Sequence, residues 1–125
     1  MKRILLIIMF ASIFSFFASG LRAQSDSLAV AGRMLASSSC LIVDVRTPEE
    51  YAGGHNEGSV NIPLSELKSE TARLKPYRNL ILVCRSGKRA GMAKRELEKE
   101  GFRHVCNAGG WETLEKLLKG RAASK

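Results

Sequence analysis

The 125-residue sequence is poor in aromatic and metal-binding residues. Aromatic side chains make up 6% of the chain, and there are two histidines. Proteins that bind nucleic acids usually place aromatic rings among their basic residues, and this chain lacks that combination despite a formal net charge of +8. The sequence shows no metal-ligand spacing, internal repeat or low-complexity segment. It therefore argues against a nucleic-acid-binding protein, and we expect no metal ion or other cofactor.

The sequence also lacks an apolar run long enough to span a membrane. Its longest run, Ile4–Phe17, is shorter than the about 20 apolar residues that a transmembrane helix requires. Two basic residues precede this run and small residues follow it, which is typical of a secretory signal peptide. We expect residues 1–23 to be such a peptide, cleaved after Ala23 or Gly20; an uncleaved anchor is the alternative. Export would place the protein in a bacterial periplasm, without stable membrane association after cleavage, and would lower its net charge to +5.

Three cysteines are an odd number for a protein in an oxidising compartment. A bridge between Cys40 and Cys106 would leave Cys84 free, as a nucleophile requires. However, the apolar pattern places Cys40 at the start of one strand and Cys106 at the end of another, where the sulfurs can be too far apart. We therefore favour two unbridged buried thiols. A disulfide at Cys84 would block that residue, so it needs a reducing pathway or a bound sulfur atom.

A short loop between a buried strand and a helix carries most of the expected chemistry. The apolar run Leu80–Val83 predicts a strand that ends at Cys84, and a helix should begin four or five residues later. The first turn of a helix leaves its backbone N–H groups without partners, so the loop can direct several of them at one point. The loop combines three cations with a glycine; its residues are Arg85, Ser86, Gly87, Lys88 and Arg89.

Such a loop would hold an anion beside Cys84. The N–H groups, the helix dipole and the cations each favour the thiolate, which is the attacking form of cysteine. Cys84 is therefore the candidate nucleophile, and the five loop residues that follow it are the candidate substrate-binding residues. The anion could be a persulfide or a phosphate or arsenate oxyanion. The plainer alternative is a buried cysteine at a strand end, followed by the solvated basic start of a helix.

Asp44 is the one charged residue in the apolar run Leu41–Val45, which predicts a central parallel strand. A carboxylate in such a strand is costly to bury without a partner. It should lie near the carboxyl end of the strand, where α/β proteins bind ligands. We expect Arg89 to pair with Asp44 and so to support the loop. Pairing with Arg46, or a carboxylate that caps the following turn, are the alternatives.

The alternation of strand and helix patterns predicts an α/β fold with a parallel sheet of four or five strands and helices on both faces. We expect a helix and lead-in at residues 24–40, one domain at 41–120 and a frayed tail at 121–125. No strand is recognised before the first helix. Thr47 precedes a proline and two acids, which favours a capped helix, and His55 is expected to make a structural hydrogen bond.

Four segments in the expected order resemble signatures of the rhodanese-like sulfurtransferase family. The resemblance covers residues 41–118, and the short chain and export signal are most similar to the small periplasmic phage-shock-type thiosulfate sulfurtransferases. The segments are Leu41–Tyr51, Gly54–Leu64, Cys84–Arg89 with its Cys-x-x-Gly-x-Arg spacing, and Gly101–Trp111.

The resemblance implies a single rhodanese-like domain and a two-step reaction. The Cys84 thiolate would take the outer sulfur of thiosulfate, hold it as a persulfide, and pass it to a thiophilic acceptor such as cyanide or a thiol. Four residues separate Cys84 from Arg89, one fewer than in related cell-cycle phosphatases, which favours sulfur over a phosphate or arsenate. A persulfide carrier or a binding module is the remaining alternative, and we expect a monomer.

Overall fold

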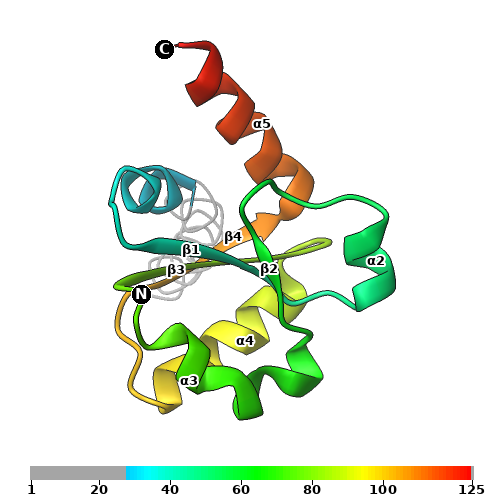
Figure 1. The fold of residues 1–125 in the computed structure, drawn as a ribbon, viewed down its shortest axis with the longest axis vertical. Coiled ribbons are helices and arrows are strands. Elements are labelled where there is room, and N and C mark those ends of the chain that lie inside the picture. Colours follow the sequence, from blue (N-terminus) through cyan, green and yellow to red (C-terminus); the bar gives the residue numbers. More distant parts are fainter. Residues whose placement is uncertain (1–27, 125) are drawn as a thin grey trace, which may run out of the picture.

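The computed structural model describes residues 28–124, so the expected signal peptide lies outside the described residues. Four strands form one parallel sheet in the order β2-β1-β3-β4 (Figure 1). This arrangement confirms the predicted α/β class and parallel sheet. The strands are β1 (Cys40–Asp44), β2 (Val60–Asn61), β3 (Asn79–Cys84) and β4 (Val105–Gly110).

Helices cover both faces of the sheet, as the sequence predicts. One face is packed by η1, α3 and α4, and the other by the helix at residues 28–35 and by α5 (Figure 1). The short helix α2 lies at the side of the sheet near β2. The bounds are 28–35 for the first helical stretch, α2 (Pro48–Ala52), the 3-10 helix η1 (Leu64–Glu70), α3 (Thr71–Leu74), α4 (Lys88–Lys99) and α5 (Trp111–Ala123).

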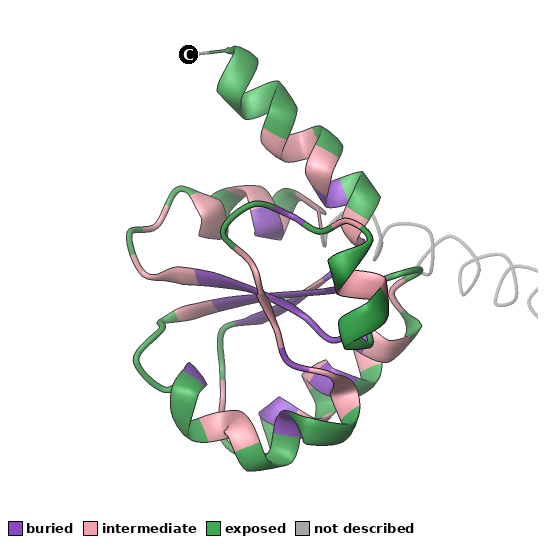
Figure 2. Ribbon diagram, turned by 45° about the vertical axis from the view of Figure 1, so that its right-hand side comes forward, coloured by how far each residue is buried: buried purple, intermediate pink, exposed green. Residues whose placement is uncertain are grey.

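Strand β3 forms the centre of the core because it pairs with β1 on one side and β4 on the other. Alternate side chains of a strand point to opposite faces, so Leu80 and Leu82 enter one apolar cluster while Ile81 and Val83 enter the other. All four are buried, and the ribbon at the centre of the sheet is coloured purple for buried residues in Figure 2. Burying each such side chain contributes roughly 1.5–3 kcal/mol. The strand that carries the candidate nucleophile is thus held rigidly on both faces.

The parallel arrangement brings the predicted site residues to one edge of the sheet. Asp44 ends β1 and pairs with Val83, and Cys84 ends β3 and pairs with Gly110 at the end of β4. The carboxyl ends of all strands therefore meet beside the loop that follows Cys84. This edge is where open α/β sheets bind their ligands.

Two elements differ from the sequence interpretation. Helix α5 continues to Ala123, into residues 121–125 that we expected to form a tail. The side chain of Arg121 donates a hydrogen bond to the carbonyl of Gly32 at 2.8 Å, which attaches the end of α5 to the first helix. Cys106 lies near the start of β4 rather than at a strand end, because β4 runs on to Gly110.

The cysteines agree with the interpretation that Cys40 and Cys106 are not bridged. Cys40, Cys84 and Cys106 form no disulfide. Within residues 28–124, no helix is both long and apolar enough to cross a membrane.

Candidate active site

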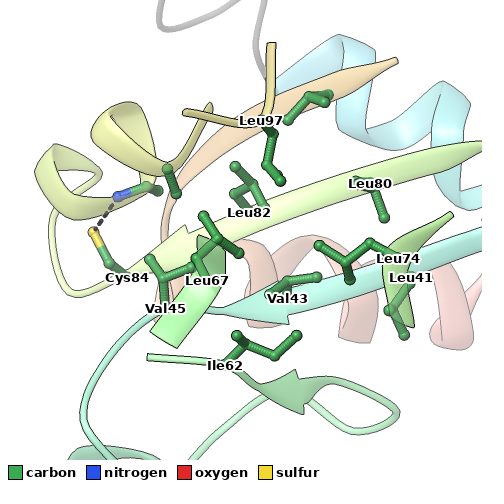
Figure 3. Close-up of a cluster of buried hydrophobic side chains, with 13 residues drawn as sticks. Leu41, Val43, Val45, Ile62, Leu67, Leu74, Leu80, Leu82, Cys84 and Leu97 are labelled. Atoms are coloured by element: carbon green, nitrogen blue, oxygen red, sulfur yellow. Dashed lines mark hydrogen bonds between the residues drawn. The ribbon is translucent and has the colours of Figure 1, made fainter. Parts of the chain in front are cut away.

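The sulfur of Cys84 lies against backbone N–H groups of the following turn. Its Sγ accepts hydrogen bonds from Gly87 N at 2.9 Å and from Ala90 N at 3.5 Å. Figure 3 shows the sulfur directed at the first turn of α4, away from the leucines of the cluster behind it. Helix α4 begins at Lys88, four residues after the cysteine, as predicted. The strand, loop and helix order therefore places a sulfur atom at a helix N-terminus.

This sulfur takes the place of a helix cap. Gly87 is the N-cap of α4 and has no side chain to offer, so Cys84 Sγ satisfies an N–H group of the first turn instead. In the described part of the chain, the backbone N–H groups of Ser86, Lys88 and Arg89 have no protein partner. They can accommodate further negative charge in the same place, which is the anion-binding arrangement that the sequence predicts.

Gly87 makes this turn possible. Its φ of +99° lies in the left-handed region, which residues other than glycine rarely adopt. A Cβ atom on Gly87 would also lie 3.1 Å from Gly109 Cα. The loop is therefore fixed both by its own conformation and by the segment behind it.

The segment behind the loop is the end of β4, and Asn107 connects the two. Its Nδ2 donates to Gly87 O at 3.0 Å, and its Oδ1 accepts from Gly109 N at 2.9 Å. The pairing of β3 with β4 shifts near this point, as is common beside active sites. Gly110 must lack a side chain, since a Cβ there would lie 2.8 Å from the carbonyl of Arg85. The sequence interpretation missed the role of Asn107, although an amide in an otherwise apolar strand is a visible signal.

The cation at the end of the loop pairs with a residue that we did not expect. Arg89 forms a bidentate ion pair with Glu50, with Nη1–Oε1 and Nη2–Oε2 distances of 2.7 and 2.9 Å. The expected pair between Arg89 and Asp44 is therefore wrong. The hydrogen bonds from Arg89 lower the pKa of Glu50 to about 2, and the same pair raises the pKa of Arg89.

Asp44 pairs instead with Arg46, the local partner that was the alternative. Arg46 Nε lies 2.9 and 3.0 Å from the two carboxylate oxygens, and Nη2 lies 2.7 Å from Oδ2. Both side chains are buried, with exposed fractions of 5% and 0%. Breaking a buried pair by removing one partner typically costs about 3–5 kcal/mol. Asp44 is thus a structural anchor at the strand end.

Arg46 connects this anchor to α2 and so, indirectly, to the loop. Its Nη1 donates to the carbonyl of Glu50 at 3.2 Å, and its Nη2 donates to the carbonyl of Gly54 at 2.7 Å. Helix α2 is thereby held in place, and the side chain of Glu50 reaches Arg89 from it. Any support that Asp44 gives to the loop passes through these two residues. Glu50 is the second functional residue that the sequence interpretation missed.

The pairing of Glu50 with Arg89 could not be predicted from the sequence, because a local role in the helix cap already accounts for Glu50. The helix start at Thr47 is a capping box, in which the Thr47 hydroxyl accepts from Glu50 N and Glu50 Oε1 accepts from Thr47 N, each at 3.2 Å. This confirms the predicted capped helix. The same carboxylate then binds Arg89, 39 positions away along the chain.

We expect the Glu50–Arg89 pair to stabilise the protein at pH values above the ordinary pKa of a glutamate, and to contribute nothing at pH values below 2. Because folding lowers this pKa from 4.5 to about 2, the contribution is full above pH 4.5 and is lost as the pH falls to about 2. Glu50→Gln keeps the capping box but removes the charge. It should lower the free energy of unfolding by about 1 kcal/mol at pH 7.

The measurement is urea unfolding between pH 2 and pH 7. The difference in the free energy of unfolding between wild type and Glu50→Gln should shrink as the pH falls from 4.5 to about 2. Glu49→Gln, on the same helix, is the matched control, because the Glu49 side chain has no hydrogen-bond partner among the described residues. A difference that stays constant with pH would contradict the assignment.

The remaining loop residues are free to meet a ligand. Arg85, Ser86 and Lys88 are exposed, and within residues 28–124 their side chains make no hydrogen bond or ion pair. Arg89 differs, because both of its terminal nitrogens are engaged by Glu50. Arg85 and Lys88 are therefore the loop cations that remain available to an anion from solution, whereas Arg89 is paired with Glu50.

The other two thiols differ from Cys84 in their surroundings. Burial raises the pKa of Cys40, and the neighbouring Cys106 adds to that rise. Burial likewise raises the pKa of Cys106. Both lie on the face of the sheet covered by α5, away from α4. A raised pKa leaves less of the attacking thiolate, so these thiols are poorer nucleophiles.

His55 and Trp111 line a surface groove of about 380 Å³ between the end of α2 and α5. His55 Nδ1 lies 2.8 Å from the carbonyl of Tyr51, and its ring stacks on the Tyr51 ring, which confirms the predicted structural hydrogen bond. Trp111 packs against the α5-side cluster, and the Arg46 guanidinium lies 4.9 Å from its ring centroid. Both residues therefore make structural contacts, His55 with α2 and Trp111 with the apolar cluster under α5 and with Arg46.

The chain matches a known family model and curated relatives. The model described as "Rhodanese-like domain" matches residues 27–116. The thiosulfate sulfurtransferase PspE of Escherichia coli is 43% identical over 74 residues, which are 58% of this chain and 71% of PspE. Two Bacillus subtilis proteins are 41% and 38% identical, and the matches span 36% and 55% of their lengths.

Solved structures agree with this match. The Escherichia coli structure titled "rhodanese with anions" is 40% identical with a TM-score of 0.55, and the match covers 58% of this chain and 88% of the other. A human single-domain sulfurtransferase is 32% identical with a TM-score of 0.57, covering 71% of this chain and 93% of the other. The four-stranded sheet and the loop after β3 lie within the matched part of the family model.

Proposed function

This chain belongs to the family of rhodanese-like domains, and we propose that within it the chain is a thiosulfate sulfurtransferase that uses Cys84 as its nucleophile. One observation carries the proposal. Cys84 Sγ accepts hydrogen bonds from two backbone N–H groups at the start of α4. The unpartnered N–H groups beside it can bind one more anionic atom. That arrangement suits a cysteine that carries a terminal, negatively charged sulfur.

The first step transfers one sulfur atom to Cys84. The thiolate attacks the outer sulfur of thiosulfate, the S–S bond of thiosulfate breaks, and sulfite leaves with the electron pair of that bond. The product is a Cys84 persulfide with one negative charge. The N–H groups of the turn stabilise this charge as an oxyanion hole stabilises an oxygen anion, where removing one donor typically costs about 3 kcal/mol.

The second step returns the enzyme to its starting state. A thiophilic acceptor such as cyanide or a thiolate attacks the terminal sulfur, the persulfide bond breaks, and Cys84 leaves as a thiolate. Net charge is conserved in both steps and no external oxidant or reductant is needed. Burial raises the pKa of Cys40 and Cys106 and so disfavours their thiolates, and it is Cys84 whose sulfur lies against the N–H groups of the α4 turn.

Arg85 is expected to gather the dianionic substrate. Arg85→Ala should raise the KM for thiosulfate by about threefold to tenfold at low ionic strength, because an exposed, unpaired cation near the sulfur is lost. Its kcat should change little. Steady-state kinetics at low and high salt measure both values. As a control, Arg103→Ala removes an exposed cation at the other end of the sheet and should leave KM unchanged. If Arg85→Ala also had the wild-type KM, Arg85 would not gather the substrate.

Mass spectrometry of the protein after thiosulfate treatment tests the proposal directly. We expect a mass gain of one sulfur atom, located at Cys84 by peptide mapping and removed by cyanide. No gain, or a gain at another cysteine, would overturn the assignment. The phosphatase alternative has its own test, since hydrolysis of a phosphate ester at a rate comparable to sulfur transfer would favour an oxyanion substrate. A persulfide that forms but does not turn over would favour a carrier.

The cellular setting is a further part of the proposal. The signal-like pattern at residues 1–23 supports export to a periplasm. The same spectrum would show whether the mature chain begins after residue 20 or 23.

A further inference from the structure

Helix α4 presents a stripe of three basic residues and one methionine to solvent. Its inner face is formed by Ala90, Ala93 and Leu97, which are buried against the sheet. Spacings of four, three and four residues place one further set of side chains together on the opposite face. All four are exposed and none is acidic, and we call them the α4 stripe: Lys88, Met92, Arg95 and Lys99.

The cations of the α4 stripe are not used by the fold. Of the side chains described, those that form ion pairs are Arg46, Arg73 and Arg89, each with an acidic partner. Lys88, Arg95 and Lys99 make no ion pair or hydrogen bond within residues 28–124. Like charges at neighbouring positions of a helix face are mildly destabilising. Arg95 and Lys99 are such a pair, and neither forms an ion pair with a described acidic side chain.

An apolar side chain interrupts the basic residues. Met92 is 46% exposed, and Tyr77 is the one other large apolar residue of the described chain with a comparable exposure. Methionine is flexible and polarizable, and it is common on surfaces that contact proteins. Unpaired cations can attract an acidic protein surface, and the exposed methionine between them can contact it.

The α4 stripe also begins at the reactive sulfur. Lys88 is the first residue of α4 and belongs to the loop that follows Cys84. Helices rise 1.5 Å per residue, so the stripe extends about 16 Å from this loop to Lys99. A partner that lay along the stripe would reach the loop with one end.

We propose that the α4 stripe docks an acidic protein whose cysteine accepts sulfur from the Cys84 persulfide. The step rests on the proposed function. The partner's thiolate attacks the terminal sulfur, the Cys84–sulfur bond breaks, and Cys84 leaves as a thiolate while the partner becomes the persulfide. Both reactants are anions, so cations along the approach lower the repulsion between them and raise the rate of encounter.

The observations favour a protein over an anionic membrane surface as the occupant. One exposed methionine offers little area for insertion into lipid. A bilayer lying on the stripe would also cover the Cys84 loop at its end, and lipids carry no thiol to receive the sulfur.

The test compares two synthetic acceptor peptides of equal length, each with a single cysteine. One has glutamates around the cysteine and the other has glutamines. The protein is loaded with thiosulfate, and transfer to each peptide is followed by mass spectrometry. At low salt the acidic peptide should react with a kcat/KM about tenfold higher, and the difference should vanish at high salt.

Two double variants separate the contribution of the α4 stripe from that of the reaction centre. Arg95→Glu/Lys99→Glu should abolish the preference for the acidic peptide. Lys75→Glu/Arg78→Glu makes the same change of charge beside the start of β3, at the other end of the sheet, and should retain the preference. Transfer to cyanide serves as the internal reference for each variant, and circular dichroism reports whether it is folded.

The outcomes separate the two proposals. If no persulfide forms, the proposed function fails. If a persulfide forms and cyanide removes it but both peptides react equally, or if the preference survives in Arg95→Glu/Lys99→Glu, the docking surface is overturned. Binding to phosphatidylglycerol vesicles that this variant loses, without a peptide preference, would assign the stripe to lipid instead.

Discussion

Replacing Cys84 with serine is expected to reduce sulfur transfer from thiosulfate to cyanide by several orders of magnitude, to the rate without protein. A serine hydroxyl is not ionised near neutral pH, and an alcohol oxygen cannot form the persulfide on which both steps depend. The loss should appear in kcat, because Arg85 and Lys88 still gather the substrate. Steady-state formation of thiocyanate measures it.

The same variant should remain folded. Cys84 is 1% exposed and its Sγ accepts hydrogen bonds from Gly87 N and Ala90 N, and a hydroxyl oxygen can accept from the same groups. The free energy of unfolding should fall by no more than about 2 kcal/mol.

Cys106→Ala provides a matched control, since it changes a buried cysteine on the neighbouring strand that lies in the other apolar cluster. It should keep its turnover and acquire sulfur at Cys84. Turnover that survives in Cys84→Ser, or disappears in folded Cys106→Ala, would show that the nucleophile is elsewhere.

The parts of the site that the sequence predicts are those built from consecutive residues. Apolar β-branched and leucine residues end at Cys84, and a glycine and cations precede a helix, so strand, turn and helix follow from local patterns. The unpartnered N–H groups of the first helical turn are a property of any helix. Only the placement of the sulfur among them required the structure.

Contacts between distant segments could not be predicted in the same way. A buried carboxylate requires a partner, but the pattern does not say which of two arginines supplies it. Asp44 takes Arg46, two positions away, and this leaves Arg89 to pair with Glu50. Glu50 already had a satisfied local role in the capping box, so no unmet requirement indicated a second partner.

The support behind the loop was hidden for a different reason. Asn107 bonds Gly87 and Gly109 at once because the register between β3 and β4 shifts by one residue beside the loop. An irregularity of this kind depends on how two strands meet, and neither strand alone encodes it. The local prediction thus identifies the reactive sulfur, while the structure identifies what holds its turn in place.

A second large effect is expected from a single methyl group at Gly87. Gly87→Ala places a Cβ atom where φ is +99° and where Gly109 Cα lies 3.1 Å away, so the turn must shift. The N–H of residue 87, now 2.9 Å from Cys84 Sγ, would move with it. Because one such donor contributes about 3 kcal/mol to the stabilisation of a developing anion, kcat should fall by about 100-fold.

Gly101→Ala separates the position of this donor from general backbone strain. Gly101 has nearly the same φ, +97°, in the turn between α4 and β4, and a Cβ there would meet no atom within 4 Å. Both variants should lose about 1–2 kcal/mol of stability, the usual penalty for a side chain in the left-handed region. Only Gly87→Ala should also lose turnover. If the two variants lost turnover equally, or if folded Gly87→Ala kept the wild-type kcat, the sulfur would not depend on the amide of residue 87, and the anion-binding turn would not be the source of catalysis.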